Sequence, residues 1–189
     1  MLTVACVEHG NYEGRGREYV DKLAAMVGRW LTVPYEFHCI RPNVGLTGWW
    51  NKVYLFKRGL FRGGRILYLD LDTVIVGPLD QLVQHKGILH LDRWGWSKKV
   101  YGSGVMCWDA DEHTDIWARF AVGQTLLHEG DQNWIQACGE WPSLPDGLCV
   151  SYRYHCKKGP PPGASVVCFH GRPKCHEFAP NHWVTRAWG

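Results

Sequence analysis

The sequence predicts a single α/β domain in which a mostly parallel central sheet is covered by helices on both faces. Short apolar runs rich in β-branched residues alternate with segments of helical periodicity through the first half of its 189 residues. Strands that alternate with helices in this way pair in parallel, which indicates a doubly covered sheet. No repeat or linker divides the chain, because the Gly- and Pro-rich stretch at 157–163 is short and late.

Hydrophobic periodicity predicts the elements of the first half. Residues 2–7 form an apolar run that ends at a Gly-Asn turn, which indicates a buried strand. Val20, Leu23 and Val27 recur at helical spacing, which predicts a helix over 18–27. Similar patterns predict, in order, a strand at 35–40, a helix at 49–60, a strand at 66–76 and, after Gly77-Pro78, a short helix at 79–83.

The second half of the chain has a looser pattern. Four short apolar runs predict strands at 88–91, 104–108, 148–152 and 165–169. Helical spacing predicts helices at 115–122 and 131–138. Residues 157–163 are expected to form a loop between the last two strands.

Composition excludes several classes of protein. Apolar residues make up 46% of the chain and charged residues 21%, which is typical of a globular protein and not of a disordered or fibrous one. Eleven tryptophans predict an unusually aromatic core or binding surface. The net charge of +3 does not by itself indicate a polyanion-binding protein. Residues 150–189, however, carry six basic residues and one acidic residue, so this segment is either an anion-binding region or a solvated tail.

The sequence also predicts a compartment. No stretch approaches the roughly 18 apolar residues of a membrane span, and the first residues lack the basic leader of a signal peptide. We therefore expect a cytoplasmic protein with no membrane insertion, in which the eight cysteines are reduced. The cysteines and histidines between 149 and 176 lack a recognised zinc spacing, so a structural zinc site is not favoured.

Two carboxylates interrupt the longest apolar run. Asp70 and Asp72 lie at i and i+2 within 66–76, so in one continuous strand they point to the same face. Burial of carboxylates among Leu and Val is costly unless they are paired, hydrogen-bonded or bound to a metal. Oxygen ligands at the carboxyl end of a strand suit Mg²⁺ or Mn²⁺. The alternative is a turn in which the two side chains cap a loop or pair with Arg65.

Four further segments accompany this Asp-Leu-Asp string. They are Trp-Trp-Asn-Lys at 49–52, Tyr-Gly-Ser-Gly-Val-Met at 101–106, Gly-Asp-Gln-Asn at 130–133 and His-Gly-Arg-Pro-Lys at 170–174. In this order the segments resemble the motifs of nucleotide-sugar glycosyltransferases with the GT-A fold, in particular glycosyltransferase family 8 and its small phage and bacterial relatives. The resemblance spans nearly the whole chain. It implies one GT-A-like, Rossmann-type domain whose residues 1–100 bind the nucleotide and whose residues 101–189 complete the acceptor and metal sites.

The resemblance implies a metal-dependent hexosyltransferase that moves a hexose from a UDP-sugar to a hydroxyl acceptor with retention of configuration. The leaving diphosphate develops negative charge, which a divalent metal and nearby cations neutralise. The acceptor stays open between a glycan, a protein and a hydroxymethylated base in phage DNA, with which the basic segment and Lys98-Lys99 are compatible. The expected location is the cytoplasm of a bacterial cell or a phage-infected host.

The resemblance also implies roles for individual residues. Because imidazole favours Mn²⁺ over Mg²⁺, the metal is expected to be Mn²⁺ held by Asp70, Asp72 and His170. The catalytic residues are Asp131 and Gln132 at a helix start, where Asp131 alternatively serves only as an N-cap. The donor is expected to contact Asn11, Tyr12, Lys52, Asp70, Gly171, Arg172 and Lys174, and the sugar or acceptor to contact Asp92, Trp94, Trp96 and Ser103.

Two positions depart from the family pattern. Cys175 stands where the relatives have proline in a late motif that is compressed here, which leaves Arg172 and Lys174 as alternative diphosphate ligands. Asn133 replaces the second aspartate of the Asp-Gln-Asp segment, which bears on the acceptor side and on the stereochemistry.

Two other classes of function stay open. A nucleotidyltransferase also uses Asp-x-Asp with a metal, and Gly-Arg-Gly-Arg at 14–17 approaches the glycine-rich, basic loop that such an enzyme needs after its first strand. A non-catalytic module that binds sugar or nucleic acid explains the tryptophan content but leaves the aspartate pair without a purpose.

Overall fold

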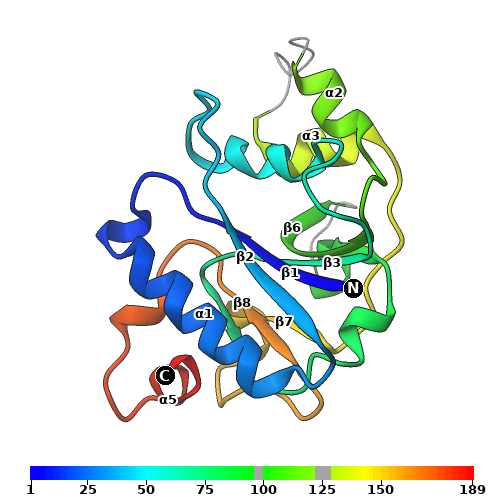
Figure 1. The fold of residues 1–189 in the computed structure, drawn as a ribbon. Helices are drawn as coiled ribbons and strands as arrows, with labels where there is room; N and C mark the ends of the chain where they lie inside the picture. The colour runs from blue at the N-terminus through cyan, green and yellow to red at the C-terminus, as the bar shows by residue number, and fades with distance from the viewer. Residues whose placement is uncertain (96–99, 122–128) are drawn as a thin grey trace.

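The computed structural model describes residues 1–95, 100–121 and 129–189, and its centre is a five-stranded sheet (Figure 1). β1 pairs in parallel with β2 and β3, whereas β6 runs antiparallel to β3 and β5. Because β5 is antiparallel to β6, it points the same way as β1, β2 and β3, so the mostly parallel sheet that the sequence predicts is confirmed. The strand order is β2-β1-β3-β6-β5, with bounds β1 (Leu2–Val7), β2 (Tyr35–Ile40), β3 (Arg65–Leu69), β5 (Gly87–His90) and β6 (Tyr101–Asp109).

Helices and a smaller sheet complete the described fold. The α-helices are α1 (Gly16–Trp30), α2 (Asp115–Ala121), α3 (Asp131–Cys138), α4 (Tyr152–His155) and α5 (Trp183–Trp188). The 3-10 helices are η1 (Tyr12–Gly14), η2 (Gly48–Phe56), η3 (Leu82–Gln84), η4 (Leu91–Trp94) and η5 (Cys175–Glu177). The smaller sheet has the order β4-β8-β7, formed by β4 (Thr73–Ile75), β8 (Val166–Cys168) and β7 (Cys149–Ser151).

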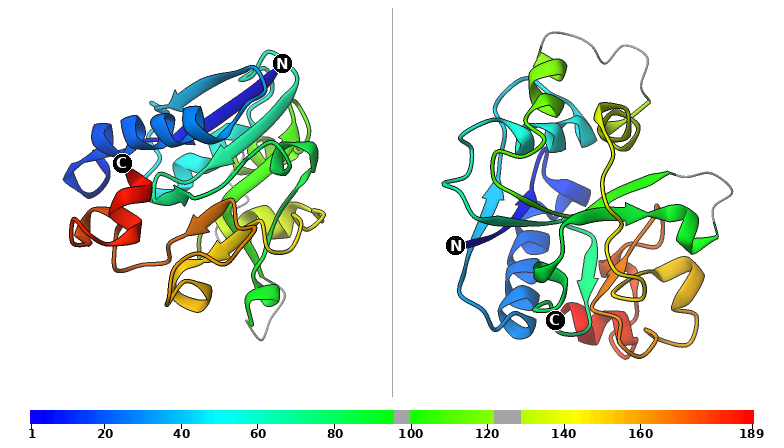
Figure 2. Two further views of the ribbon diagram at one scale, coloured as in Figure 1. Left: turned by 90° about the horizontal axis from the view of Figure 1, so that it is seen from below. Right: turned by 90° about the vertical axis from the view of Figure 1, so that its right-hand side faces the viewer.

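Both faces of the central sheet are buried at β1 and β3, which explains why these two strands are almost continuously apolar, whereas the edge strand β2 alternates with exposed polar residues. Along β3, Leu67 and Leu69 enter one core, which also contains residues of α1, α5 and the smaller sheet. Ile66 and Tyr68 alternate to the opposite face and enter a second core with residues of η2, α2 and α3. Helices therefore cover both faces, as predicted, and Figure 2 shows the two layers from further directions.

The predicted strand over 66–76 is wrong, because the chain leaves one sheet and enters another at the aspartates. β3 ends at Leu69, and β4 begins at Thr73 and pairs with β8 in the smaller sheet. Between them, both the backbone N–H and the hydroxyl of Thr73 donate hydrogen bonds to the Asp70 carbonyl oxygen. Asp70 and Asp72 therefore lie in a turn, and they do not share one face of a strand.

The predicted helix at 49–60 is also changed, because it is the 3-10 helix η2 and ends at Phe56. The amide of Asn51 donates to the carbonyl oxygens of Leu46 and Gly48, so a side chain satisfies the Gly48 carbonyl, which an α-helix would pair with its own backbone. Elsewhere β6 is longer than predicted, and η3 covers only the end of the expected helix at 79–83. Val122, the last residue of the expected helix at 115–122, lies outside the described residues.

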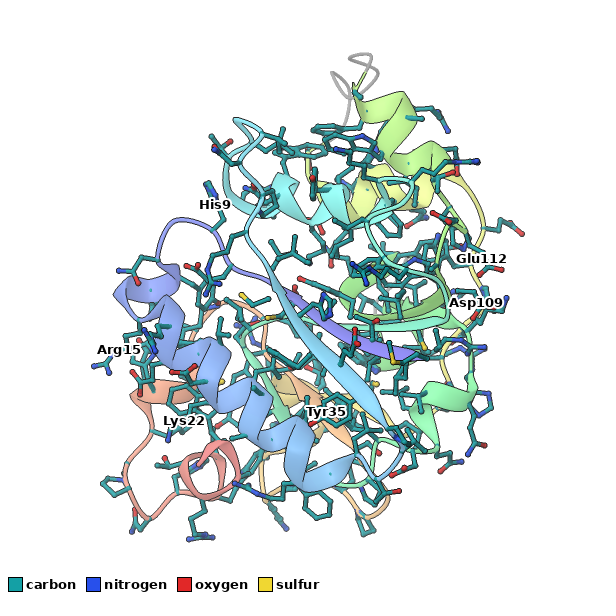
Figure 3. The ribbon with its side chains drawn as sticks, in the orientation of Figure 1. His9, Arg15, Lys22, Tyr35, Asp109 and Glu112 are labelled. Atoms are coloured by element: carbon teal, nitrogen blue, oxygen red, sulfur yellow. The ribbon has the colours of Figure 1, made fainter. Side chains whose placement is uncertain are left out.

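Arg65 is not the partner of the aspartate pair. Its guanidinium donates to Asp109 at 2.7 Å, and Lys86 forms ion pairs with Asp109 and Glu112. Asp109 and Glu112 lie together at the end of β6 (Figure 3).

All eight cysteines are free thiols. Among the described helices, none has the length and apolar character needed to span a bilayer.

The central strand gives a direct test of this packing. Leu67→Ala removes a side chain that is 0% exposed in β3, and we expect the free energy of unfolding to fall by about 2–5 kcal/mol. Urea denaturation followed by circular dichroism measures the change. Val33→Ala is the control, because Val33 is 38% exposed and its truncation leaves no cavity. Equal losses in the two variants would contradict the assignment of β3 to the core.

Candidate functional site

The turn at 70–72 lies where three strands of the central sheet share an edge. β1 and β3 are parallel, so their carboxyl ends meet there, and antiparallel β6 brings Ser103 and Gly104 to the same edge. The backbone N–H of Asp70 donates to the Gly104 carbonyl oxygen at 2.8 Å, which anchors the turn to β6. Open α/β sheets bind their ligands at this kind of edge.

Asp70 is held by a lysine from η2. The Lys52 ammonium lies 2.9 Å from one carboxylate oxygen of Asp70, and the Tyr68 hydroxyl donates to the same carboxylate at 2.5 Å. Lys52 is only 7% exposed, so its ammonium is buried at this edge of the sheet. Burial opposes its charge, but the nearby Asp131 and Asp70 outweigh burial and raise the pKa of Lys52, which therefore remains an ammonium.

The same ammonium reaches Asp131 at the start of α3. Its nitrogen lies 3.2 Å from an Asp131 carboxylate oxygen and 2.9 Å from the Ser103 hydroxyl, which itself donates to Asp131 at 2.5 Å. Asp131 therefore does not act as an N-cap, because Gly130 occupies that position and the carboxylate points into this network. The neighbouring Gln132 accepts a hydrogen bond from the Ser103 backbone at 3.3 Å.

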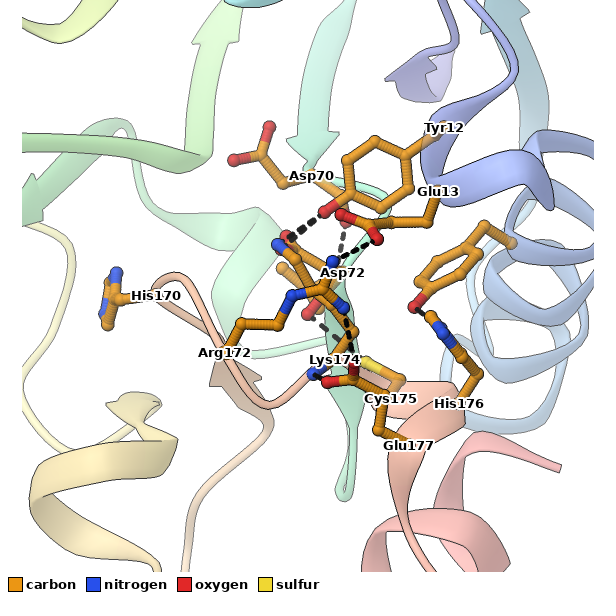
Figure 4. Close-up of polar contacts among 12 residues, drawn as sticks. Tyr12, Glu13, Asp70, Asp72, His170, Arg172, Lys174, Cys175, His176 and Glu177 are labelled. Atoms are coloured by element: carbon orange, nitrogen blue, oxygen red, sulfur yellow. Dashed lines mark hydrogen bonds and ion pairs between the residues drawn. The ribbon is translucent and has the colours of Figure 1, made fainter.

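Asp72 has different partners, which come from the two ends of the chain. The Tyr12 hydroxyl donates to it at 2.8 Å, and the Lys174 ammonium lies 2.7 Å from the same oxygen (Figure 4). Burial and the adjacent Asp72 charge raise the pKa of Tyr12 above its ordinary value, so its phenol stays protonated and donates. The two aspartates therefore occupy separate hydrogen-bond networks.

Arg172 lies beside this second network. Its guanidinium forms ion pairs with Glu13 and Glu177, and the pair with Glu13 measures 2.8 Å (Figure 4). Lys174 thus reaches the aspartate turn and Arg172 lies beside it, and each of them is paired with acidic side chains of the chain itself.

His170 lines the same region with its imidazole mostly buried. Burial lowers the pKa of His170, so the ring is neutral near pH 7, and its Nε2 atom is buried without a hydrogen-bond partner in the part of the chain that the structure describes. The ring packs edge-on against Trp94, with centroids 5.3 Å apart. In the described part of the chain no three His, Cys, Asp or Glu side chains are close enough together to hold a metal ion, so Asp70, Asp72 and His170 are not assembled as a ligand set.

Two cavities flank the aspartate turn. The Tyr12 cavity measures about 290 Å³, and its lining includes His9, Tyr12, Trp49 and Tyr68. The Gln132 cavity measures about 510 Å³, and its lining includes Trp49, Ser103, residues 129–133, His170 and Gly171. Asp70, Asp72 and Lys52 border both. The first cavity is built entirely from residues before 73, and the second mostly from residues after 102.

The remaining predicted residues lie apart from this centre. Asn11 is exposed, and its side-chain oxygen accepts a hydrogen bond from the Gly16 backbone, which is a local turn contact. Asp92 is exposed on η4, and the described lining of the two cavities does not include it. Trp94 contacts the His170 ring, and the described lining of the two cavities does not include it. Trp96 lies outside the described residues.

Sequence reasoning did not assign two residues that border the cavities. Tyr68 lies two positions before Asp70, and this spacing was the signal that its hydroxyl would reach the carboxylate. Trp49 is 61% exposed and borders both cavities. Its place in the Trp-Trp-Asn-Lys segment was a signal, but periodicity does not distinguish an exposed tryptophan from a buried one.

No protein-family model and no curated protein sequence matches the chain. Solved structures do match its fold. An active-site mutant of LgtC matches with a TM-score of 0.63 and 11% identity, covering all of this chain and 94% of that one. Galactosyltransferase LgtC in complex with donor and acceptor sugar analogues matches with a TM-score of 0.58 and 12% identity, and the match covers 92% of that chain. The glycosyltransferase GlyE of Streptococcus pneumoniae matches with a TM-score of 0.70 and 12% identity, and the match covers 60% of that chain. The chain therefore has a GT-A-like glycosyltransferase fold, as predicted.

The buried ammonium provides a test of the site's construction. Lys52→Met leaves Asp70 and Asp131 without their shared cation, and we expect a loss of about 3–5 kcal/mol in the free energy of unfolding. Lys57→Met is the control, because Lys57 is exposed and its ammonium lies over the Tyr54 ring with no ion pair among the described residues, and its effect should stay within about 0.5 kcal/mol. Chemical denaturation measures both. A loss below about 1 kcal/mol for Lys52→Met would contradict the central role of this charge.

Proposed function

We propose that this chain is a metal-dependent glycosyltransferase that moves a hexose from a UDP-sugar to a hydroxyl acceptor with retention of configuration. The observation that carries the proposal is the position of Asp72. It lies in a turn at the carboxyl ends of parallel strands, between two cavities, with a phenol and an ammonium directed at its carboxylate. A carboxylate at such an edge would hold a divalent metal, and the metal and the nearby ammonium would neutralise the diphosphate end of a nucleotide sugar.

Three side chains beside the turn have the chemistry of a divalent-cation site, although among the described residues they are not gathered into a ligand set. Asp70, Asp72 and His170 border one small cavity of about 40 Å³, and the buried Nε2 atom of His170 has no hydrogen-bond partner among the described residues. Two carboxylates and a neutral imidazole suit Mn²⁺ better than Mg²⁺. When bound there, the metal supplies Lewis-acid stabilisation of the leaving diphosphate. Lys174 must then release Asp72, and its ammonium is free to pair with the diphosphate.

The two cavities divide the substrates. The Tyr12 cavity, with its aromatic walls and its residues from 1–100, is assigned to the nucleoside. The Gln132 cavity, mostly from residues 101–189, is assigned to the hexose and the acceptor. Lys52 and Ser103 hold Asp131 in place, and we assign Asp131 and Gln132 to the sugar. An amide is a poor nucleophile, so Gln132 orients the sugar and forms no covalent intermediate.

The geometry gives less support to a nucleotidyltransferase. Arg15 and Arg17 in the Gly-Arg-Gly-Arg segment pair with Glu18 and Asp21 on α1, so this basic pair is directed along the helix. Gly16 begins α1 and is buried. No part of this segment borders the two cavities among the described residues.

Ligand-induced stabilisation tests the proposed donor. With Mn²⁺ present, UDP at about 100 times its Kd should raise the melting temperature by about 5–10 °C, and the rise should vanish in Asp72→Asn. Asp21→Asn is the matched control, because this exposed carboxylate on α1 is remote from both cavities and should leave the rise intact. A response to ATP or CTP without one to UDP would overturn the proposed donor.

The Lys174–Asp72 pair makes a second prediction. Lys174→Met frees Asp72, so Mn²⁺ alone should bind about three- to tenfold more tightly, which corresponds to a competing ion pair of roughly 1 kcal/mol. UDP should bind the Mn²⁺-loaded variant more weakly, because one cation for the diphosphate is lost. Calorimetric titration measures both affinities, with Lys158→Met as control. If Mn²⁺ affinity is unchanged or falls, Lys174 does not compete with the metal.

A further inference from the structure

A third cavity lies next to the proposed acceptor region and belongs to neither substrate assigned above. It measures about 190 Å³ and shares Phe169 and His170 with the surroundings of the Gln132 cavity. We call it the Arg153 pocket. Its lining is Tyr152, Arg153, Lys157, Phe169, His170, Arg172 and Pro173. Three of these described lining residues are cationic and none is acidic.

The cations of this pocket differ in how far their charge is compensated. Arg172 is paired with Glu13 and Glu177. Within the described residues, Arg153 forms no ion pair, and its guanidinium donates only to the His170 carbonyl oxygen at 3.3 Å. Lys157, which is exposed, forms no ion pair there either. Two uncompensated positive charges therefore face one concave site, which is an arrangement that attracts an anion.

The shape of the pocket decides which anion it suits. Tyr152 stacks on Phe169 with ring centroids 4.7 Å apart and also packs against Phe178 and Trp183, so its ring is occupied and offers no platform for a base. Arg186 does not extend the pocket into a track, because it lies on α5 and donates to the Asn181 carbonyl oxygen. A single phosphate fits these features better than a nucleic-acid backbone, which needs a basic groove and stacking surfaces.

We propose that the Arg153 pocket binds a phosphate monoester carried by a sugar or polyol acceptor, with Arg153 and Lys157 as its ligands. The inference rests on the proposed function, because it places the acceptor hydroxyl in the adjoining Gln132 cavity. The donor diphosphate is not the occupant, since Asp70, Asp72 and Lys174 are absent from the described lining. The pocket thus selects phosphorylated acceptors over neutral ones.

Direct binding tests the pocket without requiring transfer. Glucose 6-phosphate serves as the probe, with glucose, inorganic phosphate and a single-stranded oligonucleotide for comparison, in calorimetric titrations. Wild-type protein should bind glucose 6-phosphate and not glucose, and Arg153→Glu/Lys157→Glu should weaken this binding by at least about tenfold. Arg62→Glu/Lys158→Glu makes the same change in net charge on exposed residues outside the pocket, and it should bind the probe as wild type does. Melting temperatures confirm that both variants fold.

The outcomes separate this inference from the proposed function. UDP binding with Mn²⁺ should be equal in wild type and both variants, and a loss confined to Arg153→Glu/Lys157→Glu would assign the pocket to the donor and overturn the inference. Tighter binding of the oligonucleotide than of glucose 6-phosphate would overturn it in favour of nucleic acid. Equal weakening of glucose 6-phosphate binding in the control variant would also overturn the inference, because the binding would then depend on net charge and not on the pocket. If UDP fails to bind while the probe binds through Arg153 and Lys157, the pocket stands and the proposed donor falls.

Discussion

The geometry of the site depends on one buried charge, the ammonium group of Lys52. An isolated ammonium in this position would cost several kcal/mol, so the fold is stable only if carboxylates reach it. Asp70 supplies one from the turn that follows β3, and Asp131 supplies the other from the start of α3. The position of α3 relative to the central sheet is therefore fixed by an electrostatic requirement as well as by packing against the core.

The same constraint explains why two aspartates separated by one residue behave differently. Asp70 is committed to Lys52 and Tyr68, whose positions depend on the second core. Asp72 pairs with Tyr12 and Lys174, and neither residue belongs to the central sheet. Replacing the ammonium on Asp72 with another cation disturbs no core contact of β3. Asp70 thus supports the architecture as well as bordering the proposed metal site, whereas Asp72 can exchange its partner without disturbing the core.

Local hydrophobic periodicity predicts most helices and strands, but it does not predict features that depend on pairing between distant parts of the chain. The strands at 2–7 and 35–40 and the helix at 131–138 have the predicted bounds. In the strand at 2–7 the apolar run coincides with burial, and in the edge strand at 35–40 apolar residues alternate with exposed polar ones. The run at 66–76 was misread, since β3 and β4 are both buried and no change of period marks the passage from one sheet to the other. The burial of Lys52 was equally invisible, because its two carboxylates lie far along the chain.

The basic residues of 150–189 are also not distributed as their number alone suggests. Residues 150–189 carry a clear excess of basic side chains, yet that excess is not one functional unit. Arg172 and Lys174 are balanced by acidic residues near the aspartate turn, whereas Arg153 and Lys157 are not balanced within the described structure. An anion is attracted most strongly where positive charge is uncompensated and the surface is concave. The attraction of the segment for anions is therefore greatest beside His170, at a place that the net charge of the chain does not reveal.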